Sequence, residues 1–134
     1  MSKLVHVAVG VITRLKITGQ REFFLTKRSD NVHQGGKWEF PGGKVEDEET
    51  VAEALSRELN EEVGISVLSC QPLTIIEHDY GDKRVALDVF IVEHFENEPQ
   101  AQEGQVEGWF LLTDLKVLDF PAANQAIIAL LSDH

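Results

Sequence analysis

The feature that most constrains this chain is a segment at residues 43–65 in which many acidic side chains accompany a regular apolar pattern. The apolar residues recur at the three- and four-residue spacing of one helical face. Gly64 stands where a glycine commonly ends a helix. The pattern therefore predicts an amphipathic helix over residues 49–63.

Three carboxylates of this predicted helix fall on a single face. Glu58, Glu61 and Glu62 stand at positions i, i+3 and i+4, so their side chains lie about one turn apart. Like charges at these offsets repel each other by roughly a few tenths of a kcal/mol per pair. Hard divalent cations prefer oxygen ligands of this kind. We predict that this face binds Mg²⁺, or Mn²⁺ in its place; the alternative is a solvated acidic surface.

The identities around the carboxylates follow a known pattern. The sequence matches the pattern GX5EX7REUXEEXGU at every position, where U is a bulky aliphatic residue. The matching residues are Gly43, Glu49 and the run at residues 57–65. The chain thus resembles the Nudix hydrolases, and in particular the branch of that family that hydrolyses 8-oxo-dGTP. The matches to this branch cover nearly the whole chain and include residues 7–10, 26–28, 39–44 and 120–124.

The resemblance implies an α/β fold, the Nudix α/β/α sandwich with a mixed β-sheet. The length of the chain predicts one domain over residues 1–134. Local patterns agree with an α/β chain that carries helices on both faces of a sheet. A loop is expected at residues 29–43, a hairpin between the first two strands and a turn at residues 80–83. The predicted strands cover residues 4–13, 22–28, 68–78, 84–94 and 106–112, and a last helix runs from Pro121 to about Leu131.

Charge and composition limit the binding partners and the compartment that are expected for this chain. The net charge of −11 argues against direct nucleic acid binding, which requires basic residues to neutralise phosphates. Cys70 is the single cysteine, so no intrachain disulfide can form, and a reducing compartment is expected. No signal peptide or membrane-spanning stretch is recognisable. We expect a cytoplasmic monomer that acts on a small molecule, with no membrane partner.

The resemblance also implies roles in catalysis. Glu58, Glu61 and Glu62 would bind metal, and Glu58 would also accept a proton from the attacking water. Arg57 is expected to orient a carboxylate through a bidentate pair. By resemblance, the Gly42 carbonyl and Glu103 complete the metal ligands; the alternative for Glu103 is a solvated charge on a loop.

A further set of residues is expected to bind the nucleotide. Arg28 ends a strand, where its guanidinium can meet phosphate in a bidentate way. For Asn124 the alternative is a polar residue that caps a helix end. Asp82 and Lys83 are residue types common in hairpin turns, which is the alternative for both. Lys83 also replaces an arginine of the family. Trp38 either stacks on a base or packs under the loop. The predicted substrate-binding residues are Arg28, His33, Glu39, Phe40, Pro41, Gly42, Asp82, Lys83 and Asn124.

The activity implied by the resemblance is Mg²⁺-dependent hydrolysis of 8-oxo-dGTP to 8-oxo-dGMP and pyrophosphate, which clears the nucleotide pool and avoids mutation. Attack of water at the β-phosphorus is expected. One alternative is a Nudix hydrolase for a cytosine nucleotide, ADP-ribose or a dinucleoside polyphosphate, because the motif fixes the chemistry and not the substrate. The other is a non-catalytic nucleotide-sensing module, and the intact motif argues against it.

Overall fold

A mixed sheet of seven strands forms the framework of the computed structural model, which describes residues 4–28 and 36–132. The main strand order is β3-β2-β1-β6-β5, and β4 also pairs with β1 while β7 pairs with β2. β1 and β6 run parallel, and the other pairs between the described strands are antiparallel. The strands are β1 (Leu4–Leu15), β2 (Arg21–Lys27), β3 (Trp38–Glu39), β4 (Gly42–Lys44), β5 (Ser66–Asp79), β6 (Arg84–Glu96) and β7 (Glu107–Leu111).

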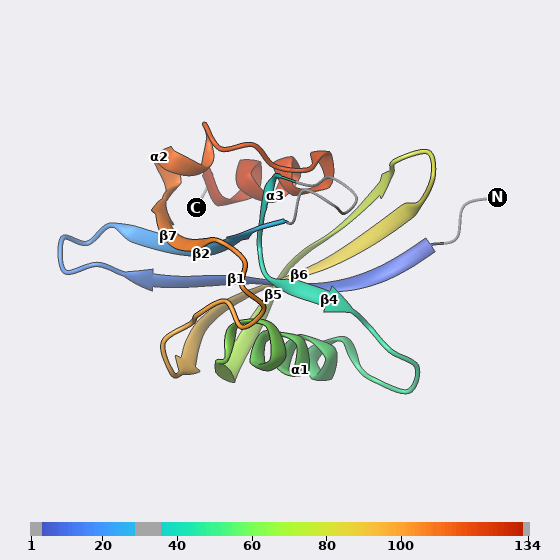
Figure 1. Cartoon of the computed structure of the whole chain (residues 1–134), viewed down its shortest axis with the longest axis horizontal. Coiled ribbons are helices and arrows are strands. Elements are labelled where there is room, and N and C mark those ends of the chain that lie inside the picture. The colour runs from blue at the N-terminus through green and yellow to red at the C-terminus, as the bar shows by residue number, and fades with distance from the viewer. Residues whose placement is uncertain (1–3, 29–35, 133–134) are drawn as a thin grey trace.

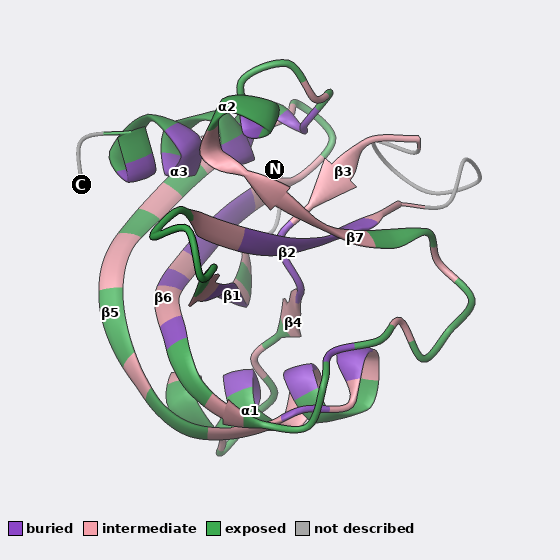
Figure 2. Ribbon diagram, turned by 90° about the vertical axis from the view of Figure 1, so that its left-hand side faces the viewer, coloured by how far each residue is buried: buried purple, intermediate pink, exposed green. Residues whose placement is uncertain are grey.

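Helices cover both faces of this sheet. α1 (Val51–Val63) lies on one face, and α2 (Leu112–Leu115) and α3 (Ala122–Ser132) lie on the other (Figure 1). The buried residues of α1 and α3 face the sheet (Figure 2). None of the described helices is long and apolar enough to cross a membrane. The predicted α/β architecture, with a mixed sheet between helices, is confirmed.

Local capping sets the ends of α1. The Thr50 hydroxyl accepts a hydrogen bond from the Glu53 N–H at 3.1 Å, and the Glu53 carboxylate accepts one from the Thr50 N–H at 2.8 Å. This capping box satisfies two backbone donors at the start of the helix. Gly64 ends the helix with φ 74°, as predicted, in the left-handed region that glycine adopts at little cost. The helix therefore starts two residues later than predicted, and Glu49 lies outside it.

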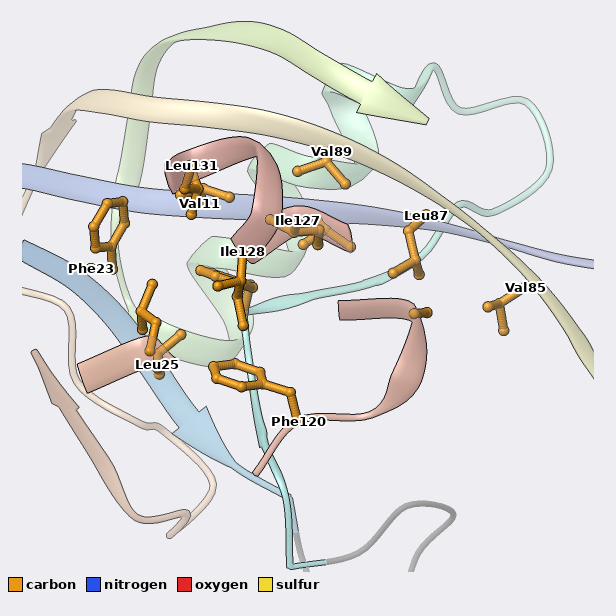
Figure 3. Packing of buried hydrophobic residues seen from close by; sticks show 14 residues of the cluster. Val11, Phe23, Leu25, Val85, Leu87, Val89, Phe120, Ile127, Ile128 and Leu131 are labelled. Carbon is orange, nitrogen blue, oxygen red and sulfur yellow. The ribbon is translucent and has the colours of Figure 1, made fainter. Parts of the chain in front are cut away.

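The apolar run of β1 feeds two cores. Val9 and Val11 face α3, whereas Ala8 and Ile12 face α1, because successive side chains of a strand point to opposite faces. This explains why nearly every residue in the middle of the strand is apolar. Figure 3 shows the α3-side cluster, in which buried side chains each contribute roughly 1.5–3 kcal/mol. Its labelled members include Val11, Phe23, Leu25, Leu87, Phe120, Ile127 and Leu131.

The loop predicted at residues 29–43 is wrong at its C-terminal end, where the short strands β3 and β4 form. Phe40 and Pro41 between them are outside any strand, and residues 29–35 lie outside the described residues. β3 pairs with β2, and β4 pairs with β1 through Val9 opposite Gly42. A β-carbon at Gly42 would lie 2.1 Å from the Ala8 carbonyl oxygen, so only glycine permits this approach. Sequence propensity disfavours glycine in strands, and here the tertiary pairing overrides it.

Both predicted hairpin connections are confirmed. β1 and β2 pair antiparallel with Thr13 opposite Phe23, and β1 continues two residues beyond its predicted end. The Tyr80 N–H donates to the Lys83 carbonyl at 2.9 Å, which closes the turn between β5 and β6. The four-residue α2 was not predicted, because so short a helix leaves no periodic signal.

Candidate active site

The carboxylate face of α1 lies directly against β4. A β-carbon built on Gly43 would lie 2.2 Å from the carboxyl carbon of Glu58. Any larger residue at that position would displace the Glu58 carboxylate. The glycine therefore brings the backbone of β4 into contact with the acidic face of the helix.

Arg57 organises the acidic side chains around it. Its Nε and Nη2 donate to the two carboxylate oxygens of Glu49 at 2.7 and 3.0 Å, which is the bidentate geometry that was predicted. Its Nη1 also donates to Glu58 at 2.8 Å and to Glu61 at 3.4 Å, and its Nη2 donates to the Lys44 carbonyl at 3.1 Å. The hydrogen bond from Arg57 lowers the pKa of Glu49 to about 2.

Glu62 occupies an unfavourable position for a negative charge. Burial raises the pKa of its carboxyl to about 8, and repulsion from Glu39, Glu58 and Glu103 adds to the shift. A hydrogen bond from the Gly42 N–H, at 3.4 Å, opposes it. Three other carboxyl groups thus act on Glu62 at this site, an arrangement that a cation would stabilise.

Backbone hydrogen bonds set the position of Glu103. The Gln100 N–H donates to the Val63 carbonyl, and the Gln102 N–H donates to the Glu62 carbonyl, each at 2.9 Å. These contacts satisfy carbonyls that the end of α1 leaves without helical partners. They tie the loop to the helix and bring Glu103 near Glu62. Sequence reasoning missed both glutamines, because their contribution comes from the main chain.

The donor chemistry of the site fits a hard divalent cation. The candidate ligands all offer oxygen, and they are Glu58, Glu61, Glu62, Glu103 and the Gly42 carbonyl. Over residues 4–28 and 36–132, no three acidic, histidine or cysteine side chains are already placed to share an ion. In the structure the Glu58 carboxylate forms an ion pair with Arg57 at 2.8 Å. The candidate ligands could hold a Mg²⁺ or Mn²⁺ ion, whose positive charge would offset the repulsion at Glu62.

A cleft of about 210 Å³ adjoins the other side of β4. β1, β4, β6, the β5–β6 turn and the start of α3 contribute to its walls. It brings together six of the predicted substrate-binding residues, namely Arg28, Glu39, Phe40, Gly42, Lys83 and Asn124. Pro41 is buried, and its carbonyl accepts the Gly10 N–H at 2.8 Å. Asp82 lies on the turn and is not part of the lining, and His33 lies outside the described residues.

Arg28 and Glu39 form an ion pair at the cleft. The Arg28 Nη1 lies 2.5 Å from the Glu39 carboxylate, and both side chains are about one-quarter exposed. Burial raises the pKa of Glu39, and the Arg28 charge opposes that shift. The guanidinium predicted to meet phosphate is thus already paired with a carboxylate in the cleft wall.

An aromatic and an amide side chain face the same cleft. Phe40 stacks on Phe120 with ring centroids 5.8 Å apart and an interplanar angle of 22°. Asn124 is only 8% exposed, and its backbone N–H donates to the Pro121 carbonyl at 2.9 Å. No hydrogen bond from its side-chain amide to another described residue is present. A nearly buried amide of this kind has its donors and acceptor available for a ligand.

Trp38 packs against protein. Its ring meets Phe110 edge-on with centroids 4.9 Å apart, and it contacts the α3-side core. It is not among the residues that line the cleft. Of the two interpretations offered by the sequence, the structure favours packing against other side chains over a free ring in the cleft.

Several residues of the cleft were not predicted from sequence. Val7 and Leu87 lie opposite each other in the parallel register of β1 and β6, and both line the cleft. The alternation of apolar residues in these strands predicts their burial, but not which face holds a ligand. Tyr80 was also missed: it was interpreted only as a turn residue, and its ring lines the cleft.

A larger cleft of about 690 Å³ lies elsewhere, between the β1–β2 hairpin, β6, α2 and α3. Its described lining contains none of the predicted catalytic, metal or substrate residues. Size alone therefore does not locate the chemistry. The charged groups and the nearly buried amide assign the candidate site to the smaller cleft.

The comparisons with known proteins agree with this geometry. The family model described as the NUDIX domain matches residues 12–130, and the chain belongs to this family. It is 40% identical to an 8-oxo-dGTP diphosphatase of Escherichia coli (strain K12) over 127 residues, which cover 95% of each protein. It is also 31% identical to a CTP pyrophosphohydrolase of the same organism, over 90% of this chain and 84% of the relative.

A solved structure extends the likeness to three dimensions. A MutT structure from work on Aliivibrio salmonicida and Vibrio cholerae superposes with a TM-score of 0.84 and 36% identity. The alignment covers 98% of this chain and 100% of that one. The predicted membership of the Nudix hydrolases and the predicted fold are both confirmed.

Proposed function

We propose that this protein is a Mg²⁺-dependent 8-oxo-dGTP diphosphatase that releases 8-oxo-dGMP and pyrophosphate. One observation carries the proposal: the two glycines of β4 line the nucleotide cleft and also touch the carboxylates of α1. Gly43 lies against Glu58, and the Gly42 N–H donates to Glu62. A polyphosphate bound in the cleft would be separated from the acidic face only by a backbone without side chains. The near full-length identity to 8-oxo-dGTP diphosphatases supports the choice of substrate.

Glu58, Glu61, Glu62, Glu103 and the Gly42 carbonyl are the proposed metal ligands. The raised pKa of Glu62 supports this role, since a nearby cation favours the charged carboxylate. When bound, Mg²⁺ would neutralise the phosphate chain and lower the pKa of the attacking water.

The protein's own side chains have separate tasks in this proposal. Glu58 accepts the proton from the attacking water, and Arg57 holds the Glu58 carboxylate in place at 2.8 Å. Arg28 meets the phosphate chain when the nucleotide competes with Glu39 for its guanidinium. Phe40 packs beside the base, and Asn124 reads its edge.

A turnover screen in ¹⁸O-labelled water tests the proposal. Purified protein is given 8-oxo-dGTP, dGTP, CTP and ADP-ribose, with and without Mg²⁺. The expected result is strong preference for 8-oxo-dGTP, dependence on Mg²⁺ and label in pyrophosphate, as attack at the β-phosphorus requires. Label in the monophosphate would overturn the position of attack. Equal hydrolysis of 8-oxo-dGTP and dGTP would overturn the substrate.

Hydrolysis of a cytosine nucleotide is the second candidate, because the relative named as a CTP pyrophosphohydrolase is 31% identical. Preference for CTP in the same screen would select it. A non-catalytic sensing role is less favoured, since every carboxylate of the motif is present. The expected monomer and cytoplasmic location stay predictions, which sedimentation equilibrium and cell fractionation can check.

A further inference from the structure

Tyr80 links two walls of the nucleotide cleft. Its own N–H closes the β5–β6 turn on the Lys83 carbonyl at 2.9 Å. Its ring meets His78 edge-on with centroids 4.4 Å apart, packs against the α3-side core and lines the cleft. These contacts hold the ring on the turn side of the cleft, and none of them involves its hydroxyl.

The Tyr80 hydroxyl accepts a hydrogen bond from the Ala123 N–H at 3.0 Å. Ala123 lies in the first turn of α3, where backbone N–H groups have no partner within the helix. A Ser, Thr, Asp or Asn side chain near the helix start commonly accepts these bonds. Residues 120–122 are Phe, Pro and Ala, which offer no side-chain acceptor. The phenol oxygen, 43 residues away in sequence, takes that place.

Asn124 follows immediately in the chain. Its backbone N–H donates to the Pro121 carbonyl at 2.9 Å, so its position depends on the same first turn of α3. Displacement of that turn would move the Asn124 amide relative to Phe40 and the other walls of the cleft. Recognition through hydrogen bonds is sensitive to such displacement, because a misplaced amide leaves buried groups unpaired.

From this geometry we infer that Tyr80 is a positioning residue for base recognition. Its hydroxyl fixes the first turn of α3, and thereby Asn124, relative to the β5–β6 turn. The inference rests on the proposed function, in which Asn124 reads the oxidised base. Tyr80 acts through Asn124, so its loss should affect selectivity more than turnover.

Tyr80→Phe tests the contact, because it removes the hydroxyl and keeps the ring. Hydrogen exchange of the Ala123 amide, followed by NMR, should become about 3- to 10-fold faster, which corresponds to the usual net value of one hydrogen bond. Since the chain has a single tyrosine, ¹³Cζ labelling gives one phenol resonance in the wild type. That resonance should shift when 8-oxo-dGMP binds. Unchanged exchange at Ala123 would overturn the inference.

Kinetics test the consequence. In Tyr80→Phe the ratio of kcat/KM for 8-oxo-dGTP over dGTP should fall by about 3- to 10-fold, through a higher KM for 8-oxo-dGTP at an unchanged kcat. Thr13→Val is the matched control, because it removes a buried hydroxyl that donates to the Glu22 carbonyl at 2.9 Å, outside the cleft lining. It should lower the melting temperature without changing the ratio.

Two outcomes separate this inference from the proposed function. An unchanged ratio in Tyr80→Phe, together with faster exchange at Ala123, would overturn the positioning role alone. A wild-type enzyme without preference for the oxidised nucleotide would overturn the proposed function. The role of Tyr80 in base selectivity would then be overturned as well.

Discussion

Arg57 binds both carboxylate oxygens of Glu49, at 2.7 and 3.0 Å, with the Nε and Nη2 of one guanidinium. The pair joins the segment that precedes α1 to the middle of the helix. The remaining nitrogen, Nη1, is directed to Glu58 at 2.8 Å. The orientation of the proposed general base therefore depends on a pair that does not itself touch the nucleotide cleft.

Arg57→Lys should impair catalysis indirectly. An ammonium keeps the charge but cannot form the two parallel hydrogen bonds to Glu49, so Glu58 loses its fixed orientation. Loss of a residue that orients a metal ligand costs about 10- to 100-fold in metal affinity or activity. We expect such a drop in kcat at limiting Mg²⁺ with little change in the KM for nucleotide. Titration of Mg²⁺ at fixed substrate measures it.

Arg14→Lys is the control for this variant. Arg14 pairs with Glu22 and Glu98 and lies over the Trp109 ring, and it is not among the cleft residues. It should leave the Mg²⁺ titration unchanged. Native Mg²⁺ dependence in Arg57→Lys would show that the bidentate pair has no part in the site.

Glu58→Gln should reduce turnover by orders of magnitude. The amide keeps the shape of the side chain but removes both the negative charge and the basic oxygen, and general base catalysis typically contributes about 10²- to 10⁴-fold. Glu62→Gln should lose a comparable factor and show a weakened response to Mg²⁺. Steady-state kinetics over a range of Mg²⁺ distinguishes the two. Glu77→Gln, an exposed change of equal charge on β5, should behave as wild type.

Glu62 should make the metal-free protein less stable as the pH rises. Its pKa is about 8 in the folded state against an ordinary value of 4.5, so the folded state binds more protons between these values. The contribution of Glu62 to the free energy of unfolding is therefore fully present below about pH 4.5 and is lost as the pH rises through 8. Above that pH this group changes the stability little. Glu49, with a pKa of about 2, acts in the opposite sense and only below pH 4.5.

Calorimetry between pH 5 and pH 9, in chelator or in Mg²⁺, measures this effect. The melting temperature in chelator should decline toward pH 8, and Mg²⁺ should restore it because it binds only the folded site. Glu62→Gln should remove the decline and the larger part of the Mg²⁺ response. A wild-type profile as flat as that of the variant would refute the placement of Glu62 in a crowded, buried cluster.

The sequence predicted α1 and its acidic face well, because helical periodicity and capping are local properties. Its end at Gly64 follows from one glycine, and its start was missed by two residues because the Thr50–Glu53 capping box was not recognised. The strand β4 could not be predicted in this way. Gly42 and Gly43 form a strand only because β1 offers them backbone partners from a distant part of the chain.

The same limit explains what was missed in the site. The family motif indicates Glu58 and Glu62 directly, but the place of Glu103 depends on backbone bonds from its loop to the end of α1. Tyr80 gave no sequence signal beyond its position next to a turn. Its contact with Ala123 exists because the fold brings the β5–β6 turn to the start of α3. Such contacts follow from tertiary packing and not from local pattern.

Asn124 should determine the preference for the oxidised base. Guanine and 8-oxoguanine share an O6 acceptor, but N7 is an acceptor in the first and an N–H donor in the second. If the Asn124 carbonyl accepts from N7–H while its NH₂ donates to O6, normal guanine sets two acceptors against each other. Leaving such buried groups unpaired costs about 1–3 kcal/mol each, so the site can reject dGTP strongly.

Asn124→Ala should therefore lose most of the preference for 8-oxo-dGTP over dGTP and still hydrolyse both with Mg²⁺. The measured quantity is the ratio of the two kcat/KM values in wild type and variant. Gln71→Ala is the matched control, since it removes an exposed amide on β5 that lies outside the cleft lining. Because the control leaves α3 and its first turn unchanged, its ratio should stay at the wild-type value. If Asn124→Ala keeps that value as well, the amide does not read the base and serves only the start of α3.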